Sequence, residues 1–382
     1  MSETGSARPA LRVLIVALAA FVMLGLIDGA VGVAWPSIRD SFGRSLADLG
    51  LLLAFGSIGY LGASIGYGWF HARMGTGSLL AGGSLLLVFG AGGVAAAPVW
   101  WAVTVSAVVL GLGGGLVDTG MNAHAALAFD VSSINLLHAS YGVGATLGPV
   151  VISASLIATD AWRGGYGFLA GLQALSALAV WARRDRWFSS EQGIGTDVGP
   201  VGRKSRMWFQ LVLFFLYTGA EVAAGQWAFT LLTEGRGVGT SAAGLWVSSY
   251  WAGLTVGRFG FGVVGGRLAP SRILSGSMVV SLLGIGLLWL DPFAIGAVGL
   301  PIAGLGLAAI FPTLVSVTPA RIGRFRSTRS MGFQLAAANI GGAGIPWILG
   351  ITAEVGGLET LGAGLFITVL LLAGMNLISE RV

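Results

Sequence analysis

Long apolar runs, separated by short polar segments, follow one another along the whole chain. A helix needs about 20 mostly apolar residues to cross a bilayer, and the runs are close to that length. They predict twelve membrane-spanning helices, at residues 12–34, 46–70, 78–96, 99–127, 133–158, 165–183, 207–232, 241–267, 272–290, 294–320, 331–353 and 361–379. The first run is too long for the apolar core of a signal peptide and lacks a small-residue cleavage site, so we retain it as a helix.

The composition also indicates an integral membrane protein. The 382 residues are 55% hydrophobic and only 10% charged, whereas soluble proteins carry about 25% charged residues. The 64 glycines allow neighbouring helices to approach closely. There is no cysteine and the three histidines are not spaced as metal ligands, so we expect no metal and no cofactor. The glycine runs lack the lysine of a phosphate-binding loop, and nothing indicates an enzyme or an ATP-driven pump.

The distribution of basic residues predicts the orientation in the membrane. With a cytoplasmic N-terminus, sixteen of the 21 Lys and Arg residues fall in inside segments, and four fall outside, namely Arg39, Arg44, Arg163 and Arg236. This bias follows the positive-inside rule. We therefore expect a multi-pass protein of the cytoplasmic (inner) membrane with both termini in the cytoplasm. Because the basic residues lie between apolar runs, the net charge of +5 does not indicate a nucleic-acid partner.

The chain is expected to contain two related halves. A polar segment at 184–206 falls at the midpoint of the span count, so we predict six-helix bundles at 1–183 and 207–382 joined by a cytoplasmic linker. A shift of 194 residues aligns five pairs without gaps: Gly25 with Gly219, Gly50 with Gly244, Gly59 with Gly253, Gly68 with Gly262 and Arg73 with Arg267. Such internal repeats around a central site are common in secondary transporters.

Ionisable groups inside apolar runs are the candidates for chemistry, because each costs roughly 2.5–3.5 kcal/mol on insertion scales. Asp118 and Asn122 are spaced i, i+4 and share a helix face. We predict that Asp118 couples transport to protons, and that His138 pairs with it from the next span. Asp28 lies in the first span and Glu221 in the seventh, and both are further candidates for proton coupling.

Each of these groups also has a purely structural interpretation. Asp118 could fix helix packing, His138 could donate to a backbone carbonyl, and Glu221 could stabilise the interface between the halves. The glycines around Asp28 suit either a close helix contact or an irregular backbone beside a cavity.

Polar and aromatic residues at membrane depth are the candidates for solute binding. An acid with a nearby indole suits a sugar, whose apolar face stacks on aromatic rings while its hydroxyls reach carboxylates and amides. The candidate binding residues are Asn122, Tyr141, Gln226, Trp227, Tyr250, Gln334 and Asn339. We expect Trp100, Trp101, Trp162 and Trp187 to lie at the membrane interface, and His124 to be solvated near a cytoplasmic end.

Two loops resemble a signature of the major facilitator superfamily. The segment from Gly68 to Gly75, GWFHARMG, resembles its G-x-x-x-D-R-x-G motif, and the segment 262–269, GVVGGRLA, resembles it again. Both copies lack the aspartate. The resemblance implies the major facilitator fold, an all-α membrane protein with twelve helices in two pseudo-symmetric bundles. It also implies gating roles for Gly68, Arg73, Gly75, Gly262 and Arg267, with Arg258 snorkelling or forming a pair near the inner gate.

Within the superfamily, the chain is similar to the fucose-permease and sugar-symporter group. Val117–Asn122, VDTGMN, resembles the acid-Thr-x-x-Asn element of that group, and the span from Asn135 resembles its Asn-Leu helix. Drug antiporters usually carry an arginine early in span 4, and none lies between Trp100 and Asp118.

These observations predict a monomeric secondary transporter that moves a small polar solute, a sugar as first guess, together with protons by alternating access. Two alternatives stay open, an exporter of drugs or metabolites and a non-transporting membrane sensor. The sequence does not identify the substrate, the direction of transport or the coupling ion.

Overall fold

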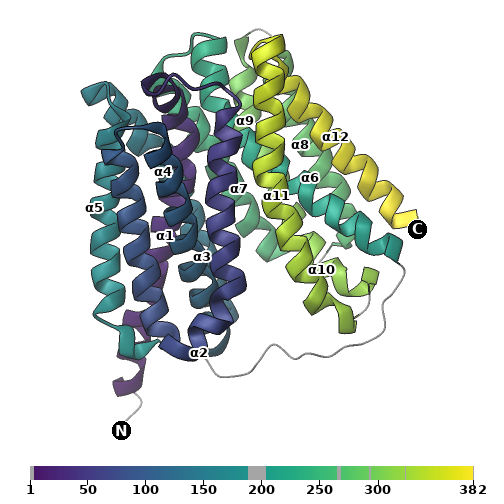
Figure 1. Cartoon of the computed structure of the whole chain (residues 1–382). Coiled ribbons are helices and arrows are strands. Elements are labelled where there is room, and N and C mark those ends of the chain that lie inside the picture. Colours follow the sequence, from purple (N-terminus) through teal and green to yellow (C-terminus); the bar gives the residue numbers. More distant parts are fainter. Residues whose placement is uncertain (1–3, 188–203, 265–267, 292–293, 323, 382) are drawn as a thin grey trace. The chain divides into compact units, whose positions relative to one another are not determined.

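The computed structural model describes residues 4–187, 204–264, 268–291, 294–322 and 324–381, and these residues form helices and turns without a strand. The first part of the chain (Figure 1) forms α1 (Thr4–Ser41), α2 (Asp48–Ala96), α3 (Trp100–Ala128), α4 (Val131–Thr159), α5 (Trp162–Trp181) and the short 3-10 helix η1 (Arg184–Arg186). The second part forms α6 (Lys204–Thr230), the π-helical turn η2 (Leu231–Gly235), α7 (Thr240–Val264), α8 (Pro270–Leu290), η5 (Gly296–Val298), α9 (Gly299–Leu307), α10 (Ile310–Ile322), α11 (Arg324–Gly356) and α12 (Thr360–Arg381).

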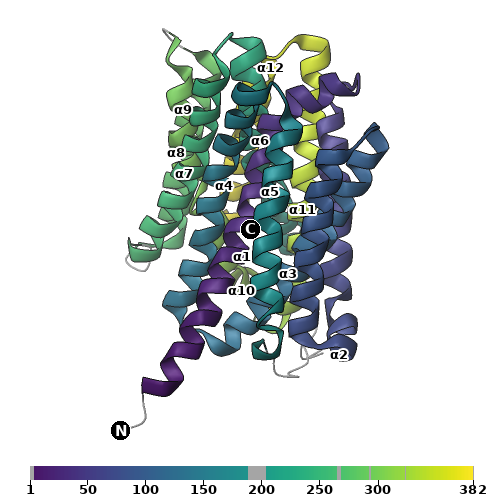
Figure 2. The same cartoon turned by 90° about the vertical axis from the view of Figure 1, so that its left-hand side faces the viewer.

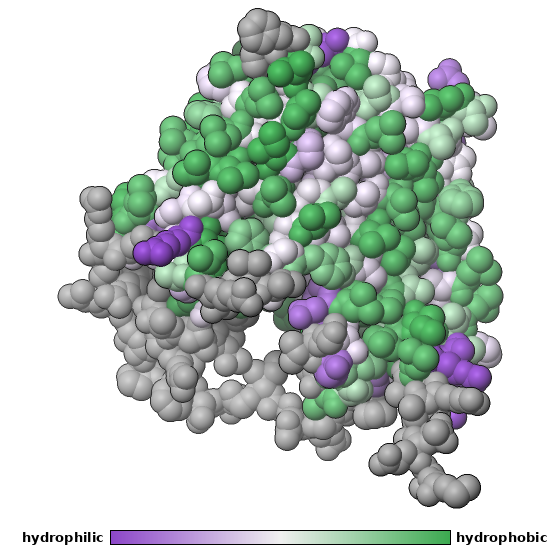
Figure 3. Space-filling view, turned by 180° about the vertical axis from the view of Figure 1, so that it is seen from behind, coloured by the Kyte–Doolittle hydropathy of each residue, from purple (hydrophilic) through white to green (hydrophobic). Residues whose placement is uncertain are grey.

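The helical membrane architecture is confirmed, whereas the count of twelve spans stays a prediction. Among the described residues, nine helical stretches are long and apolar enough to cross a membrane, and α5 and α7 are not among them. Figure 2 shows the N-terminal turns of α1 extending beyond the neighbouring helices of its unit. Hydrophobic residues cover most of the described surface visible in Figure 3, as expected for a surface that faces lipid.

Two predicted boundaries differ from the structure for identifiable reasons. The second and third predicted spans form one helix, α2, which is interrupted only at Gly75, where φ is 74° and ψ is 162°. Glycine is the residue that adopts this backbone without strain. The tenth predicted span is divided between α9 and α10. Pro312, in the first turn of α10, has no N–H and its ring crowds the carbonyl four residues earlier, which interrupts the helix at Ala308.

Packing divides the chain into two compact units. Unit 1 comprises Met1–Ser37 and Phe55–Gln192, and unit 2 comprises Ile38–Ala54 and Gly193–Val382. The segment 38–54, between the first two predicted spans, is thus grouped with unit 2. Within that unit, Arg39 Nη1 lies 3.0 Å from Glu234 Oε2, and the Ala47 N–H donates to Glu354 Oε1 at 3.0 Å. The boundaries predicted for the two bundles and the linker stay a prediction.

Glycines of the predicted repeat make matching contacts in the two units. Gly25 of α1 packs so closely on α4 that a Cβ would overlap the backbone of Tyr141. Its partner in the repeat, Gly219 of α6, packs on α11, where a Cβ would crowd Ile345 and lie 3.0 Å from the Gly341 carbonyl oxygen. The first and fourth helices of unit 1 therefore pack as α6 and α11 do in unit 2.

A second pair repeats the pattern. A Cβ at Gly59 of α2 would overlap the Val108 carbonyl of α3, and a Cβ at Gly253 of α7 would overlap the Pro301 carbonyl of α9. Small residues at equivalent crossings allow equivalent backbone approaches. These contacts support the two-fold repeat read from the sequence.

We expect Gly59→Ala to destabilise the protein, because the methyl group must displace the α3 backbone. Overpacking of this kind costs about 1–3 kcal/mol. Gly68→Ala is the matched control, since no atom lies within 4 Å of a Cβ at that position. Thermal unfolding in detergent measures both, and equal midpoints for Gly59→Ala and Gly68→Ala would contradict this account.

The expectation that His124 is solvated is wrong, whereas the tryptophans expected at the membrane interface differ in burial and their depth in a membrane stays a prediction. Trp101 is 64% exposed, but Trp100, Trp162 and Trp187 are buried, at 6%, 2% and 5% exposure. His124, expected to be solvated, is 1% exposed and packs edge-to-face against the ring of Trp187. The turn that follows α5 covers this end of α3, which the sequence periodicity does not reveal.

Candidate functional site

A polar cluster in unit 1 is centred on Asp118 of α3. Tyr60 of α2 donates its hydroxyl to Asp118 Oδ2 at 2.6 Å, and Asn122 Nδ2 donates to Asp118 Oδ1 at 3.0 Å. Asn122 also donates to the Asp118 backbone carbonyl at 3.0 Å. Both carboxylate oxygens thus accept hydrogen bonds from neutral donors, an arrangement that suits an ionised acid.

The Asp118 cluster depends on the close packing of α2 and α3. A Cβ at Gly111 would overlap the Gly56 carbonyl, and a Cβ at Gly115 would lie 2.5 Å from the Tyr60 carbonyl oxygen. The two glycines let the backbones approach, and this approach places the Tyr60 side chain on the carboxylate. Sequence reasoning missed Tyr60, although a tyrosine inside an apolar span is a usable signal.

A second acid, Asp28 of α1, lies beside the Asp118 cluster. Tyr141 of α4 donates its hydroxyl to Asp28 Oδ2 at 2.8 Å. Asp28 interacts electrostatically with Asp118, and Asp118 with His138 of α4. Four helices of unit 1 therefore bring together two carboxylates, an imidazole, two phenols and an amide. We call these six residues the unit 1 cluster: Asp28, Tyr60, Asp118, Asn122, His138 and Tyr141.

The unit 1 cluster is accessible as well as polar. Asp28 and His138 are exposed although they lie within apolar helices, and Asp118, Asn122 and Tyr141 are partly buried. An exposed carboxylate at this depth is too costly in lipid, so we expect the face that carries it to be wet. The glycines near Asp28 provide a close helix contact, since Gly25 and Gly29 both pack on the α4 backbone.

Unit 2 holds a different cluster around Glu221 of α6. Arg258 Nη2 of α7 lies 3.1 Å from Glu221 Oε1 and 3.3 Å from Oε2. Tyr217, one turn before Glu221, donates its hydroxyl to Oε2, and Tyr250 donates to the Glu221 backbone carbonyl at 2.7 Å. Arg258 thus forms a pair, as one of its two predicted roles requires, and the charge of Glu221 is compensated. Sequence reasoning missed Tyr217, although its i, i+4 spacing to Glu221 was visible.

Most residues of unit 2 predicted to bind solute are buried in its core. Trp227, at 0% exposure, donates its indole N–H to the Pro346 carbonyl at 3.0 Å. Gln226, Tyr250 and Gln334 are 4%, 0% and 1% exposed. Asn339 is partly buried and donates to the Leu335 carbonyl at 2.9 Å. Trp227 thus joins α6 to α11 and Tyr250 joins α7 to α6, whereas Asn339 bonds within α11. Solute binding by these residues stays a prediction.

The residues predicted to gate transport are only partly described. Arg73 lies over the ring of Trp69 at 3.8 Å and donates to the Trp69 carbonyl at 3.0 Å. Gly68 and Gly262 are both exposed with open space around them, and Gly75 forms the break in α2. Arg267 lies outside the described residues. The gating roles stay predictions.

The start of α4 is fixed by an N-cap. Asp130 Oδ1 accepts the Ser133 N–H at 2.9 Å, and hydrogen bonds from Ser133 lower the pKa of the exposed Asp130 carboxyl. Side-chain caps of this kind satisfy N–H groups that the helix leaves free. The cap orders the first turn of the helix that carries His138 and Tyr141.

We expect Asp130→Ala to increase amide hydrogen exchange in the first turn of α4. Because the pKa of Asp130 is lowered in the folded state, the stabilisation is present above the pKa of the unfolded chain and is lost as pH falls through the folded value. Asp130→Asn keeps a capping oxygen and should show no such acid-dependent step. Exchange rates that are equal in the wild type and Asp130→Ala would refute the role of the cap.

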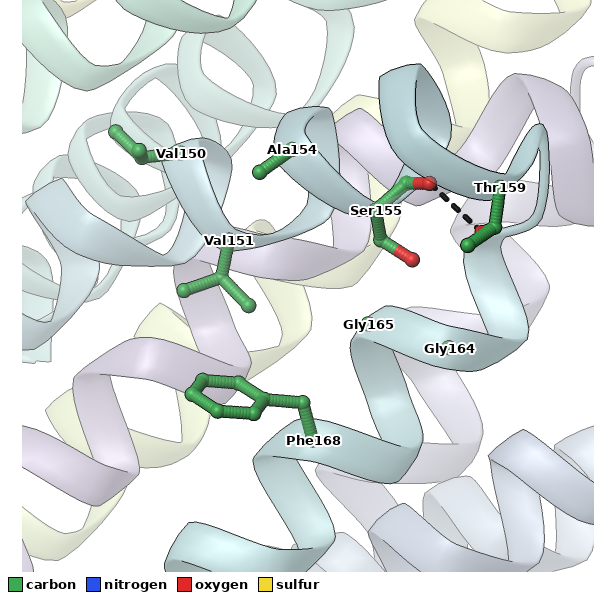
Figure 4. A pocket seen from close by; sticks show the side chains of 8 residues that line it. All are labelled: Val150, Val151, Ala154, Ser155, Thr159, Gly164, Gly165 and Phe168. Atoms are coloured by element: carbon green, nitrogen blue, oxygen red, sulfur yellow. Dashed lines mark hydrogen bonds between the residues drawn. The ribbon is translucent and has the colours of Figure 1, made fainter.

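A cavity in unit 1 has no residue of the unit 1 cluster in its lining. It has a volume of about 430 Å³ and is formed by α4 and α5, with Val151, Phe168 and Gly165 among its lining residues (Figure 4). The Ser155 hydroxyl donates to the Ala161 carbonyl at 2.7 Å, and the Thr159 hydroxyl donates to the Ser155 carbonyl at 2.8 Å. Both hydroxyl protons are therefore used within the protein and are not available to donate to a polar solute.

Comparison with known proteins identifies the relatives of the chain. The model of the family described as Major Facilitator Superfamily matches residues 17–346. The glucose/mannose transporter GlcP of Bacillus subtilis is 25% identical over 267 residues, which are 66% of this chain and 65% of GlcP. A putative glucose/galactose transporter of Helicobacter pylori is 28% identical over 141 residues, 37% of this chain and 34% of that protein. Both matches span less than two thirds of the relative's length.

Solved structures share the fold over nearly the whole chain. The nucleoside transporter NupG superposes with a TM-score of 0.79 at 13% identity, covering 97% of this chain and 99% of NupG. The fucose:proton symporter FucP of E. coli superposes with a TM-score of 0.59 at 17% identity, covering 94% of this chain and 97% of FucP. At these identities the likeness concerns the fold.

Proposed function

Because the chain belongs to the Major Facilitator Superfamily, a family of membrane transporters, we propose that it moves a small polar solute, sugar or sugar-like, by proton-coupled alternating access. The observation that carries the proposal is the unit 1 cluster, in which Asp118 is held by two donors close to Asp28 and His138. The names of the glucose, galactose and fucose transporters among its relatives support the solute class.

Asp118 is the proposed site of proton binding. Its two carboxylate oxygens accept from Tyr60 and Asn122, one donor to each oxygen, which leaves a lone pair for a proton on either oxygen. An amide NH₂ cannot accept a hydrogen bond, whereas a phenol can, so the proton belongs on Oδ2, facing Tyr60. The Tyr60 hydroxyl interacts with Ser64, which accepts from Thr119 at 3.3 Å. Proton binding thus rearranges a hydrogen-bonded chain that links α2 to α3.

Asp28 and Tyr141 are the proposed solute contacts. The carboxylate of Asp28 is exposed and uses Oδ2 to accept from Tyr141, which leaves acceptor capacity for the hydroxyls of a sugar. Asn122 lies next to Asp118 and offers an amide. Protonation of Asp118 at Oδ2 removes the charge of the carboxylate and so weakens the hydrogen bond that Oδ1 accepts from Asn122, and this connects the proton to the solute.

We expect Tyr60→Phe to slow proton-driven uptake by about tenfold or more, because a hydrogen bond to a charged group contributes about 1.5–3 kcal/mol. Solute exchange without a proton gradient should fall much less. Paired uptake and counterflow assays in proteoliposomes measure this ratio. Equal losses in both assays would show that Tyr60 acts on folding or on solute binding alone.

The orientation and assembly are also proposed. The bias of basic residues toward the predicted inside segments supports a cytoplasmic-membrane protein with both termini in the cytoplasm. We propose that the monomer is the transporting unit, since each polar cluster is formed within one chain.

A thermal-shift screen followed by counterflow tests the solute class. Sugars, amino acids and hydrophobic cations are added to the purified protein. A ligand that binds the folded state raises the midpoint temperature of thermal unfolding. We expect a neutral sugar to raise it and to exchange across the membrane. Protection by hydrophobic cations alone would indicate an exporter, and a stabilising ligand without flux would indicate a sensor.

A further inference from the structure

A groove on unit 2 combines an apolar floor with two free polar groups. It is formed by α7, α8 and α9 and has a volume of about 310 Å³. Phe261 of α7, Ile273 and Val280 of α8 and Leu305 of α9 line it. Gly276 of α8 also lines it, and a Cβ there would meet no atom within 4 Å, so the floor is open. We call this the α8 groove.

Arg272 and Ser277 are the polar groups of the α8 groove. Arg272 is exposed and forms no ion pair with any residue that the structure describes. Ser277 is 4% exposed, and within the same described ranges its hydroxyl has no hydrogen-bond partner. A buried hydroxyl without a partner is costly, and a ligand that supplies one removes the cost.

The spacing of these two groups along α8 matches a phospholipid. They are five positions apart in the sequence, which corresponds to about 7.5 Å along a helix. Arg272 lies in the first turn of α8, where the backbone N–H groups lack partners within the helix and the helix dipole favours an anion. An anion therefore fits at the Arg272 end, and a neutral acceptor fits one to two turns further along the groove.

We propose that the α8 groove binds one anionic phospholipid. The phosphate pairs with Arg272 and the start of α8, an ester carbonyl accepts from the Ser277 hydroxyl, and an acyl chain lies along Gly276, Val280 and Leu305. This site is independent of the unit 1 cluster. The apolar cavity of unit 1 in Figure 4 provides a contrast, because no charged residue lines it and its hydroxyls already have partners.

Native mass spectrometry of the purified full chain with phosphatidylglycerol or phosphatidylcholine tests the proposal. We expect one phosphatidylglycerol to stay bound per chain, with about tenfold preference over phosphatidylcholine, because the choline cation of phosphatidylcholine compensates the charge of its own phosphate and is repelled by Arg272. Arg272→Gln should lower phosphatidylglycerol to the level of phosphatidylcholine. Gly276→Leu, whose side chain occupies the open floor, should displace both lipids, and Ser277→Ala should weaken both.

Arg12→Gln is the matched control, since Arg12 is an exposed arginine of α1 that lines no described cavity. It should bind lipid as the wild type does. Equal binding of the two lipids by the wild type would overturn the proposal, and so would an unchanged preference in Arg272→Gln. Thermal unfolding midpoints measured on the same samples show whether Gly276→Leu is folded. If it is not folded, lipid binding by Arg272→Gln and Ser277→Ala tests the proposal.

Discussion

Asp118→Asn is expected to abolish solute uptake driven by a proton gradient while solute exchange continues. The amide cannot take up and release a proton, yet it has nearly the shape of the carboxyl group and can still accept from Tyr60. Proteoliposomes loaded with solute measure exchange, and the same vesicles with an imposed pH gradient measure driven uptake. Driven uptake should fall to the level of protein-free vesicles.

Asp48→Asn is a suitable control for this variant. Asp48 begins α2, pairs with Arg44 at 2.9 Å and is not a member of the unit 1 cluster. The Asp48→Asn variant loses one carboxylate but keeps every member of the unit 1 cluster, so proton-driven uptake should persist. If Asp118→Asn concentrates solute as well as the wild type does, Asp118 has no part in coupling.

Glu221→Gln is expected to lower stability by about 2 kcal/mol, because the Arg258 guanidinium loses a charge-assisted partner in a partly buried site. The side chains of Arg258 and Glu221 are 34% and 14% exposed, so solvent compensates for part of the loss. The double variant Glu221→Gln with Arg258→Gln should recover part of the stability, since no uncompensated charge is left. Thermal unfolding in detergent measures all three proteins.

The same variants separate the two acidic clusters. Glu221 was predicted from its depth in span 7 to take part in proton coupling, but its ion pair supports a role in holding α6 to α7. We therefore expect Glu221→Gln, corrected for the amount of folded protein, to keep proton-driven uptake. A loss of driven uptake with unchanged stability would return Glu221 to the coupling mechanism.

Contacts within one helix could be predicted from the sequence, and contacts between helices mostly could not. The i, i+4 spacing of Asp118 and Asn122 fixes their hydrogen bond, because helix geometry alone determines it. The partner of Asp28 is 113 residues away, and its position depends on how Gly25 and Gly29 set α1 against α4. No pattern local to Asp28 specifies Tyr141.

Side-chain burial was the least predictable property. Trp227 follows an acid and a glutamine in an apolar span, and we predicted from this that its ring stacks on a sugar. In the structure its indole N–H donates to the Pro346 carbonyl in the core of unit 2. Every residue of a membrane helix is surrounded by apolar neighbours in the sequence, so hydropathy does not separate the faces that meet lipid, protein and water. The glycines that repeat after 194 residues predicted helix contacts better than hydropathy did, because a close approach of two helix backbones requires a small residue.

The most direct test of the central claim is to follow protons and solute together. Wild-type proteoliposomes in weakly buffered medium, with a pH-sensitive dye outside, receive an inward gradient of the sugar identified by thermal shift. We predict that the external medium becomes more alkaline as the sugar enters, and that Asp118→Asn shows no alkalinisation. Sugar entry without any proton movement in the wild type, or alkalinisation that persists in Asp118→Asn, would contradict the claim that this cluster couples the two.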